Sequence, residues 1–370
     1  MTTMADRDQE FRPLYAVPPG ETLEELLAER EMTQSELARR MGRPFKTINE
    51  IIHGKTAIMP ETAIQLERVL GVPANFWTNL ERQYREDQAR VREVEVLEAE
   101  AGWLDRFPLK NLKDLGHLPN TRDRATLHHY VLRFFGVADK DAWETVWAQP
   151  QATFRQSSAF APSWEATAAW LRAGALEASR VQTEPFDRGR FLSFLEKARK
   201  MTRDDPEDFL EALLEGCRAC GVVVVFLSPF KGVRAFGATH WLTPTKAVIQ
   251  LSNRYKTDDH LWFTFFHEAG HVVLHGSRKI FVETKDVRAS AIDEAEQRAN
   301  EFAGDMLISR SAWEEFIEKH PSTHTVVTKF AAEQGVSSGI VVGRLQHEGL
   351  WLQSQGNGLK RHFSLVEVES

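Results

Sequence analysis

The feature that most constrains the fold is an apolar segment over residues 258–274. It has the period of a helix, and its apolar side chains point in nearly every direction, which is typical of a buried helix. It also contains His267, Glu268 and His271. Burying these three groups without partners would be costly. The sequence therefore predicts a core helix whose polar residues share a common partner.

The three polar residues form the pattern H-E-x-x-H. Residues four apart lie on one face of a helix, so His267 and His271 can bind a single Zn²⁺. Glu268 lies beside them, where it can take a proton from a metal-bound water. We expect a Zn²⁺ site with His267 and His271 as ligands and Glu268 as the catalytic residue.

The third protein ligand is expected on a second helix, over residues 290–307. Glu296 lies four residues beyond Ile292 and three before Ala299, on the apolar face of this helix. The charged residues at positions 294, 298, 301 and 305 share the opposite face. A carboxylate on the buried face favours a cation, so Glu296 is the expected third ligand. Asn300, one turn later, is expected to hold a metal ligand in place without binding the ion itself.

Other side chains near the motif are weaker candidates. His275 also follows His271 by four residues, but Gly276 indicates that the helix ends there, so His275 is not expected to be a ligand. The group that stabilises the oxyanion stays open, with Tyr255 and His275 as weak candidates. The pair Cys217 and Cys220 ends a helix and precedes a strand, the reverse of a thioredoxin-type site, so we expect idle thiols.

The spacing of apolar residues changes at residue 221 from a helical to a strand pattern. Residues 222–227, 233–238 and 247–251 are predicted strands, and most other segments are predicted helices, including a charged linking helix over 85–100. The fold class is therefore mainly α with a small β-sheet (α+β). The expected parts are a flexible leader (1–20), a helical bundle (21–90), a helical middle region (91–220), a domain that contains the metal site (221–350) and a tail (351–370).

Composition narrows the class of protein. The net charge is −7, so any nucleic-acid binding must come from a local patch. The longest apolar run, residues 222–227, is far shorter than the roughly 20 residues of a membrane helix. Residues 1–10 are polar and acidic, unlike a secretory signal. We expect a cytoplasmic protein without a membrane partner.

Residues 34–53 show the pattern of a helix-turn-helix. Thr33 is a good N-cap for a helix over 34–41, and Glu36 is placed to complete a capping box. Gly42 breaks the chain, and Pro44 begins a second helix. The alternative is a helical bundle that binds protein and only resembles this motif.

The second helix is the expected recognition helix. Arg43, Lys46, Thr47 and Asn49 lie at its N-terminal end, where such helices contact phosphates and base edges. Residues 30–55 carry six basic and three acidic side chains, a local balance of +3. We expect binding to a double-stranded DNA operator, and a homodimer because these motifs commonly bind paired half-sites.

Two families resemble parts of the chain. The segment MTQSELARRMGRPFKTINEIIHGKTAIMPETAIQLERVLGVPANFWTNL resembles the helix-turn-helix of the XRE/HigA antitoxin class. The segments AVIQLSNRYKTDDHLWFTFFHEAGHVVLHG and EAEQRANEFAGDMLIS resemble the ImmA/IrrE zinc metallopeptidases. The second resemblance matches the family's two histidine ligands to His267 and His271 and its catalytic glutamate to Glu268. It matches the family's E-x-x-x-[DN] helix to Glu296 and Asn300.

These resemblances imply a DNA-binding transcriptional regulator fused to a zinc-dependent endopeptidase. Members of the second family cleave or inactivate helix-turn-helix repressors, so the expected protein partner is a repressor, antitoxin or toxin in a stress, toxin–antitoxin or phage-defence response. The chain itself is another possible substrate, and we expect its activity to be regulated. The alternative is a non-proteolytic HigA-like antitoxin or repressor whose metal domain only senses or binds a partner.

Overall fold

The computed structural model describes residues 15–148, 163–252, 257–275, 281–284 and 294–362. Contacts within the chain divide it into two compact units. The first comprises Met1–Asp105 and Gly116–Val131, and the second comprises Arg106–Leu115 and Leu132–Ser370. None of the described helices has the length and apolar composition needed to cross a membrane.

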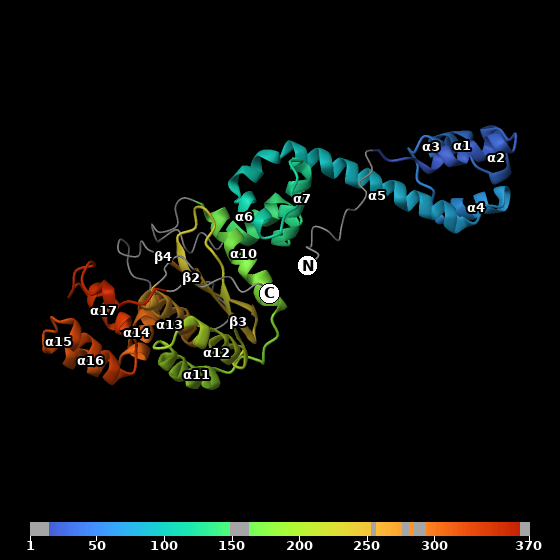
Figure 1. The fold of residues 1–370 in the computed structure, drawn as a ribbon. Coiled ribbons are helices and arrows are strands. Elements are labelled where there is room, and N and C mark those ends of the chain that lie inside the picture. Colours follow the sequence, from blue (N-terminus) through green and yellow to red (C-terminus); the bar gives the residue numbers. More distant parts are fainter. Residues whose placement is uncertain (1–14, 149–162, 253–256, 276–280, 285–293, 363–370) are drawn as a thin grey trace. The chain divides into compact units, whose positions relative to one another are not determined.

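The first unit begins with a bundle of helices (Figure 1). Its helices are α1 (Pro19–Glu29), α2 (Gln34–Met41), α3 (Phe45–Ile52), α4 (Pro60–Leu70) and α5 (Ala74–Ala99). Their shared core contains side chains from all five helices, including the fully buried Leu23, Leu37, Ile48, Leu66 and Trp77.

Local signals set the ends of α2. The hydroxyl of Thr33 accepts a hydrogen bond from the backbone N–H of Glu36 at 3.1 Å, as the predicted cap requires. The carboxylate of Glu36 instead accepts hydrogen bonds from Arg39 and Arg40, so the contacts do not form the expected reciprocal capping box. Gly42 ends the helix in the left-handed conformation, with φ of 65°.

Helix α5 differs from the prediction. A separate linking helix was expected over residues 85–100, but α5 is one helix of 26 residues. Neither proline nor glycine occurs between Ala74 and Ala99, so nothing in the sequence breaks the helix. The domain boundary that the sequence predicts at residue 90 falls inside α5, and the predicted domain bounds remain predictions.

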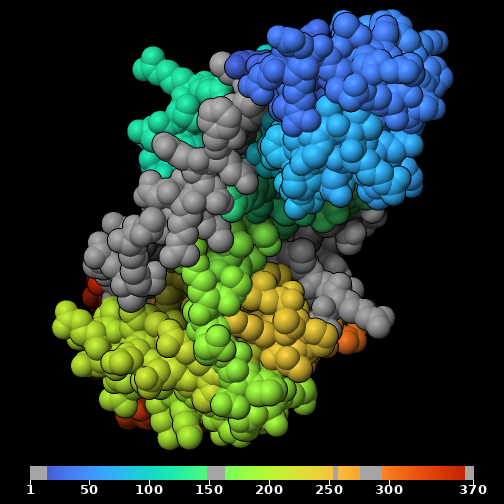
Figure 2. Space-filling model, turned by 90° about the vertical axis from the view of Figure 1, so that its right-hand side faces the viewer, coloured from blue at the N-terminus to red at the C-terminus, as the bar shows by residue number. Residues whose placement is uncertain are grey.

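Two helices, η2 (Ala101–Arg106) and α7 (Arg124–Phe135), each contain a boundary between the units. The second unit begins with α6 (Leu109–Asp114), α8 (Lys140–Trp143) and η3 (Glu144–Ala148), followed by α10 (Trp164–Arg180), α11 (Arg188–Met201) and α12 (Pro206–Arg218). Helices α10 (green), α11 and α12 (both yellow-green) form part of the surface of this unit in Figure 2.

A four-stranded sheet lies at the centre of the second unit. Its strands are β1 (Val222–Phe226), β2 (Ala235–Thr243), β3 (Lys246–Leu251) and β4 (Phe281–Thr284), in the order β1-β3-β2-β4. β1 is parallel to β3, whereas β2 is antiparallel to both β3 and β4. The sequence did not predict β4, and it placed the second strand at 233–238 rather than at Ala235–Thr243.

The remaining helices complete the second unit. They are α13 (Asp258–His275), α14 (Glu294–Leu307), α15 (Arg310–Glu318), α16 (His324–Gln334), α17 (Ser338–His347) and the short η6 (Asn357–Leu359). The expected fold class, mainly α with a small sheet, is confirmed.

The sheet is covered on both faces. Alternate strand residues point to opposite faces, and Val224 and Ile249 belong to the same core cluster as the aromatic side chains of α13. Val223 and Val248 instead pack against Ala178 of α10. Helix α13 is therefore buried between the sheet and the later helices, as its apolar composition predicts.

Two acidic residues begin α13 and are held by the C-terminal part of the described chain. The carboxylate of Asp258 accepts hydrogen bonds from the hydroxyl of Ser337 at 2.7 Å and the backbone N–H of Arg361 at 3.0 Å. The ammonium group of Lys360 lies 2.6 Å from the carboxylate of Asp259. Since the side chains of Lys360 and Asp259 are 9% and 8% exposed, this ion pair is buried. We call these contacts the α13 clasp.

Candidate metal centre and recognition helix

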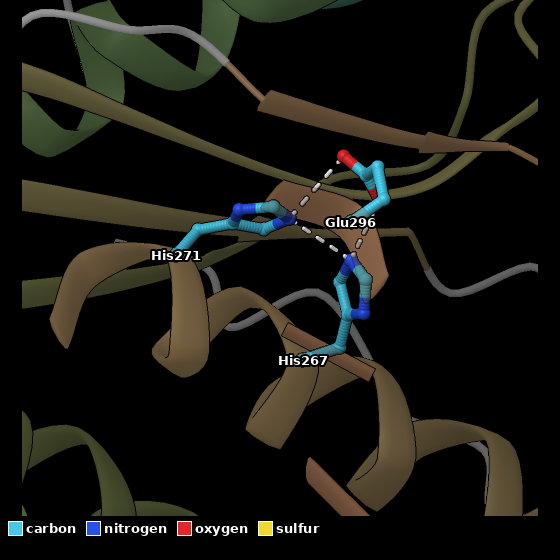
Figure 3. Close-up of side chains that lie close together, drawn as sticks. All are labelled: His267, His271 and Glu296. Carbon is cyan, nitrogen blue, oxygen red and sulfur yellow. Dashed lines mark hydrogen bonds and ion pairs between the residues drawn. The ribbon is translucent and has the colours of Figure 1, made fainter. Parts of the chain in front are cut away.

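Helices α13 and α14 bring together the three residues that the sequence predicts as metal ligands. His267 and His271 lie one turn apart on α13, and each side chain is only 1% exposed. Glu296 comes from the first turn of α14 and faces both imidazoles (Figure 3). Glu294, Arg298, Glu301 and Asp305 of the same helix are exposed. The structure thus brings the side chain of Glu296 to the two histidines, and its role as a metal ligand remains a prediction.

The distances fit a tetrahedral metal ion. The Nε2 atoms of His267 and His271 lie 3.1 Å apart. Oε2 of Glu296 lies 3.2 Å from Nε2 of His267, and Oε1 lies 3.4 Å from Nε2 of His271. A tetrahedral Zn²⁺ with bonds of about 2.0–2.1 Å holds its ligand atoms about 3.3 Å apart. These three side chains can therefore hold such an ion with little rearrangement.

The ionisation of these residues favours a cation. Burial alone raises the pKa of Glu296, but hydrogen bonds with His267 and His271 outweigh it and lower the pKa to about 2. Burial lowers the pKa of His271, although its hydrogen bond to Glu296 acts in the opposite direction. A neutral imidazole and an ionised carboxylate are the forms that bind Zn²⁺.

Contacts between α13 and α14 orient the three groups. Nδ1 of His267 lies 2.9 Å from the amide oxygen of Asn300. A proton on Nδ1 that is donated to this oxygen leaves the lone pair of Nε2 directed toward His271 and Glu296. Nε2 of His275 lies 3.2 Å from the backbone oxygen of Ala295, so His275 also joins the two helices.

Glu268 lies between α13 and the sheet and is fully buried. Its Oε2 atom accepts a hydrogen bond from the hydroxyl of Thr239 on β2 at 2.6 Å. The same strand approaches Glu268 closely at Gly237, where an added Cβ atom would lie 2.6 Å from Oε1. Sequence reasoning missed both strand residues. Only Gly237 carried a signal, because a glycine inside a strand often marks a close approach.

The remaining candidates are Tyr255, His275 and the two cysteines. Tyr255 lies outside the described residues. His275 is directed to the backbone of α14, which does not favour it as an oxyanion donor. Cys217 and Cys220 are both buried and form no disulfide, consistent with the expected idle thiols. Burial raises the pKa of Cys217 well above its ordinary value.

Of the four candidate DNA-binding residues, Arg43 lies in the turn before α3, whereas Lys46, Thr47 and Asn49 lie within the helix, and their environments differ. Lys46 is the most exposed, with 86% of its side chain accessible and Glu50 3.8 Å away. Thr47 is partly exposed. Arg43 donates a hydrogen bond to Gln65 at 2.6 Å, and Asn49 donates one to Gln34 at 3.4 Å. Part of the hydrogen-bonding capacity of Arg43 and Asn49 is therefore used within the bundle.

Comparisons with known proteins assign both parts of the chain. Residues 23–77 match the family model described as Helix-turn-helix. A regulator from Escherichia coli K12, described as the uncharacterized HTH-type transcriptional regulator YddM, is 35% identical over 66 residues, which are 18% of this chain and 70% of that protein. The chain belongs to the helix-turn-helix regulators. Residues 217–346 match the peptidase M78 family model, described as the IrrE N-terminal-like domain.

Solved structures similar to the helix-turn-helix domain include two antitoxins. An addiction module antidote protein of the HigA family from Coxiella burnetii is 30% identical, with 23% of this chain and 95% of that chain covered and a TM-score of 0.21. The Pseudomonas aeruginosa antitoxin HigA, solved with the higBA promoter, is 31% identical, with 23% and 94% covered and a TM-score of 0.22.

The chain therefore joins a helix-turn-helix domain, a DNA-binding fold, to an IrrE-like domain that matches the peptidase M78 family. The resemblances noted in the sequence are confirmed. The matched IrrE-like segment contains β1–β3, α13, α14 and all three residues of the candidate metal centre.

Proposed function

We propose that this chain is an operator-binding regulator whose IrrE-like domain is a zinc-dependent endopeptidase. The observation that carries the proposal is the convergence of His267, His271 and Glu296 at 3.1–3.4 Å, with Glu268 next to a ligand in the sequence. Three protein ligands leave one position of a tetrahedral ion for water or substrate, which is the arrangement of catalytic rather than structural zinc sites.

Each residue of the proposed site has a separate role in peptide hydrolysis. His267, His271 and Glu296 would hold a Zn²⁺ ion, which would supply a more acidic water and Lewis acidity toward the scissile carbonyl. Asn300 would keep the imidazole of His267 in place. Glu268 takes the proton of the attacking water on a carboxylate oxygen and passes it to the nitrogen of the leaving amine.

We further propose that the substrate is a repressor or antitoxin-type protein, or this chain itself, and that cleavage follows a cellular signal. The fusion of the peptidase domain to a helix-turn-helix domain supports this proposal, as does the likeness of the latter to proteins described as antitoxins. Unregulated proteolysis in a cell is harmful, which favours low basal activity. We propose that the chain functions in the cytoplasm as a homodimer on duplex DNA.

Metal analysis tests the site. Protein purified without added metal should contain about one equivalent of zinc per chain. The double variant His267→Ala, His271→Ala should contain none, whereas Glu301→Gln, a change on the exposed face of α14, should keep it. Unchanged zinc in the double variant would reject the site.

Co-expression tests the proteolysis. The wild type and Glu268→Gln are each produced with the product of the neighbouring gene, under DNA damage or phage challenge, and both chains are followed by mass spectrometry. Fragments are expected only with the wild type, because Glu268→Gln removes the proton acceptor and leaves the ligands intact. Identical fragments with both versions would assign the cleavage to another protease. The absence of fragments from both would favour the non-proteolytic regulator.

Lys46 provides the test of DNA binding. Lys46→Ala should weaken binding to the operator and reduce the slope of log affinity against log salt by about 1, since one phosphate contact is lost. Lys329→Ala on α16 is the matched control, because Lys329 is also exposed and lies 3.9 Å from a glutamate one turn away. Equal loss in both variants would contradict a specific role for α3.

A further inference from the structure

We propose that Thr239 is a positioning residue that holds the carboxylate of Glu268 in the orientation needed for proton transfer; this inference rests on the proposed peptidase function. Thr239 lies in the middle of β2, paired with Ile249 of β3 on one side and with Phe281 of β4 on the other. Its backbone is thus fixed from both sides, and its side chain is 1% exposed. The hydroxyl of Thr239 is therefore held in a fixed position.

The hydroxyl of Thr239 meets Glu268 at two points. Its oxygen lies 2.6 Å from Oε2 and 3.0 Å from the backbone oxygen of Glu268. A hydroxyl has one proton, and the shorter distance is that of an O–H···O⁻ bond of about 2.5–2.7 Å. The proton is therefore donated to the carboxylate. This bond ties the end of the Glu268 side chain to the sheet and restricts its rotation.

Gly237 provides separate evidence that β2 is shaped around Glu268. Two residues before Thr239, it faces the same side of the sheet. A Cβ atom at Gly237 would lie 2.6 Å from Oε1 and 2.8 Å from Cγ of Glu268. The strand thus leaves room for the carboxylate at one position and donates a hydrogen bond to it at the next position on that face.

The two contacts fix the carboxylate of Glu268 against β2. Oε2 accepts the hydrogen bond from Thr239, and Oε1 lies against the strand at Gly237. Small errors in the placement of a reacting group cost large factors in rate. Loss of the Thr239 hydroxyl should therefore impair Glu268 and leave the metal ligands undisturbed.

The test uses the full-length zinc protein and acetohydroxamic acid as a probe. A hydroxamate binds zinc as an anion, and the proton it loses or shares goes to the neighbouring carboxylate, so its affinity depends on the placement of Glu268. Calorimetry compares the wild type with Thr239→Val, Thr239→Ser and Glu268→Gln. Thr167→Val is the control, because Thr167 is a buried threonine of α10 whose hydroxyl donates to the backbone oxygen of Ser163, the N-cap of that helix.

Thr239→Val should weaken acetohydroxamate binding about tenfold, the loss expected for a hydrogen bond to a charged group, while zinc content and helical circular dichroism stay unchanged. Thr239→Ser should restore binding to within about threefold of the wild type, and Thr167→Val should match the wild type. Valine is a favourable strand residue, so the variant should fold. If it does not fold, Thr239→Ala takes its place.

Equal affinity of the wild type and Thr239→Val would overturn the role of Thr239 while leaving the proposed function intact. Equal weakening in Thr239→Val and Thr239→Ser would overturn it too, because packing rather than the hydroxyl would then be responsible. A wild type that holds zinc but does not bind acetohydroxamate would overturn the proposed peptidase site, and this inference with it.

Discussion

Asn300 offers the narrowest test of how the metal centre is held. Its amide oxygen lies 2.9 Å from Nδ1 of His267 and contributes no atom to the proposed coordination. Asn300→Ala should lower zinc affinity by about 10–100-fold, the usual loss when a group that orients a ligand is removed. A competition titration with a chelator measures the change. Gln297→Ala, on the exposed side of α14, is the control; equal losses in both variants would contradict the assignment.

His240 makes the stability of the second unit depend on pH. It lies on β2, is 7% exposed, and neither ring nitrogen has a hydrogen-bond partner among the residues that the structure describes. Burial lowers its pKa from 6.5 to about 4. The unfolded chain binds this proton at a higher pH than the folded chain does. The free energy of unfolding should therefore fall as the pH decreases from about 6.5 to about 4, by about 3 kcal/mol from this group.

Chemical denaturation of metal-free protein measures this effect. His240→Leu should remove this pH-dependent contribution. The difference in the free energy of unfolding between the variant and the wild type should therefore change with pH between about 6.5 and 4, and stay constant below about pH 4. Metal-free protein is used because zinc binding requires deprotonated ligands and would itself make stability depend on pH. A pH-independent difference between the two proteins would show that His240 is not neutral and buried in solution.

At the level of helices and strands, the close approach of α13 and α14 depends on Gly270. A Cβ atom there would lie 3.0 Å from the ring of Phe302 and 3.3 Å from Cα of Ala299. Gly270→Val should therefore push α14 away and lower both zinc affinity and the free energy of unfolding, the latter by about 1–3 kcal/mol. Denaturation and metal titration provide the measurements.

Gly304 of α14 provides the contrasting control. An added Cβ atom would meet nothing closer than 3.9 Å, so Gly304→Ala should be neutral or stabilising by up to about 1 kcal/mol through helix propensity. If Gly270→Val behaves like Gly304→Ala, the two helices are not packed as closely as described.

Sequence patterns predicted those elements whose ends carry local chemistry. The bounds of α2 and α4 follow from Thr33, Gly42, Pro60 and Gly71, and the strands β1 and β3 follow from their β-branched runs. The position of Glu296 followed from helix periodicity. β4 was missed because it is short and is formed by pairing with β2, which lies far away in sequence. Thr239 was missed for the same reason, since a contact between a strand and a helix leaves no spacing to detect.

The whole chain should unfold in two steps, since it forms two compact units. Zinc stabilises whichever unit binds it, by about 2.7 kcal/mol when free zinc is 100 times the dissociation constant. Chelation should therefore lower the melting temperature of the second unit, and operator DNA should raise that of the first. Differential scanning calorimetry with each addition checks both. If either addition moves both transitions, the two units are energetically coupled.

The α13 clasp also affects when helix α13 can complete its folding during translation. Asp258 and Asp259 are separated by about 100 residues from Arg361 and Lys360, their partners. After His275 has been added, the ribosome must still add 86 residues to reach Arg361, which takes roughly 4–17 s at about 5–20 residues per second. Until then the helix carries two carboxylates that lack their counter-charges. The helix-turn-helix segment, by contrast, has been synthesised by residue 77. The nascent chain thus gains the means to fold its DNA-binding end well before its metal-binding one.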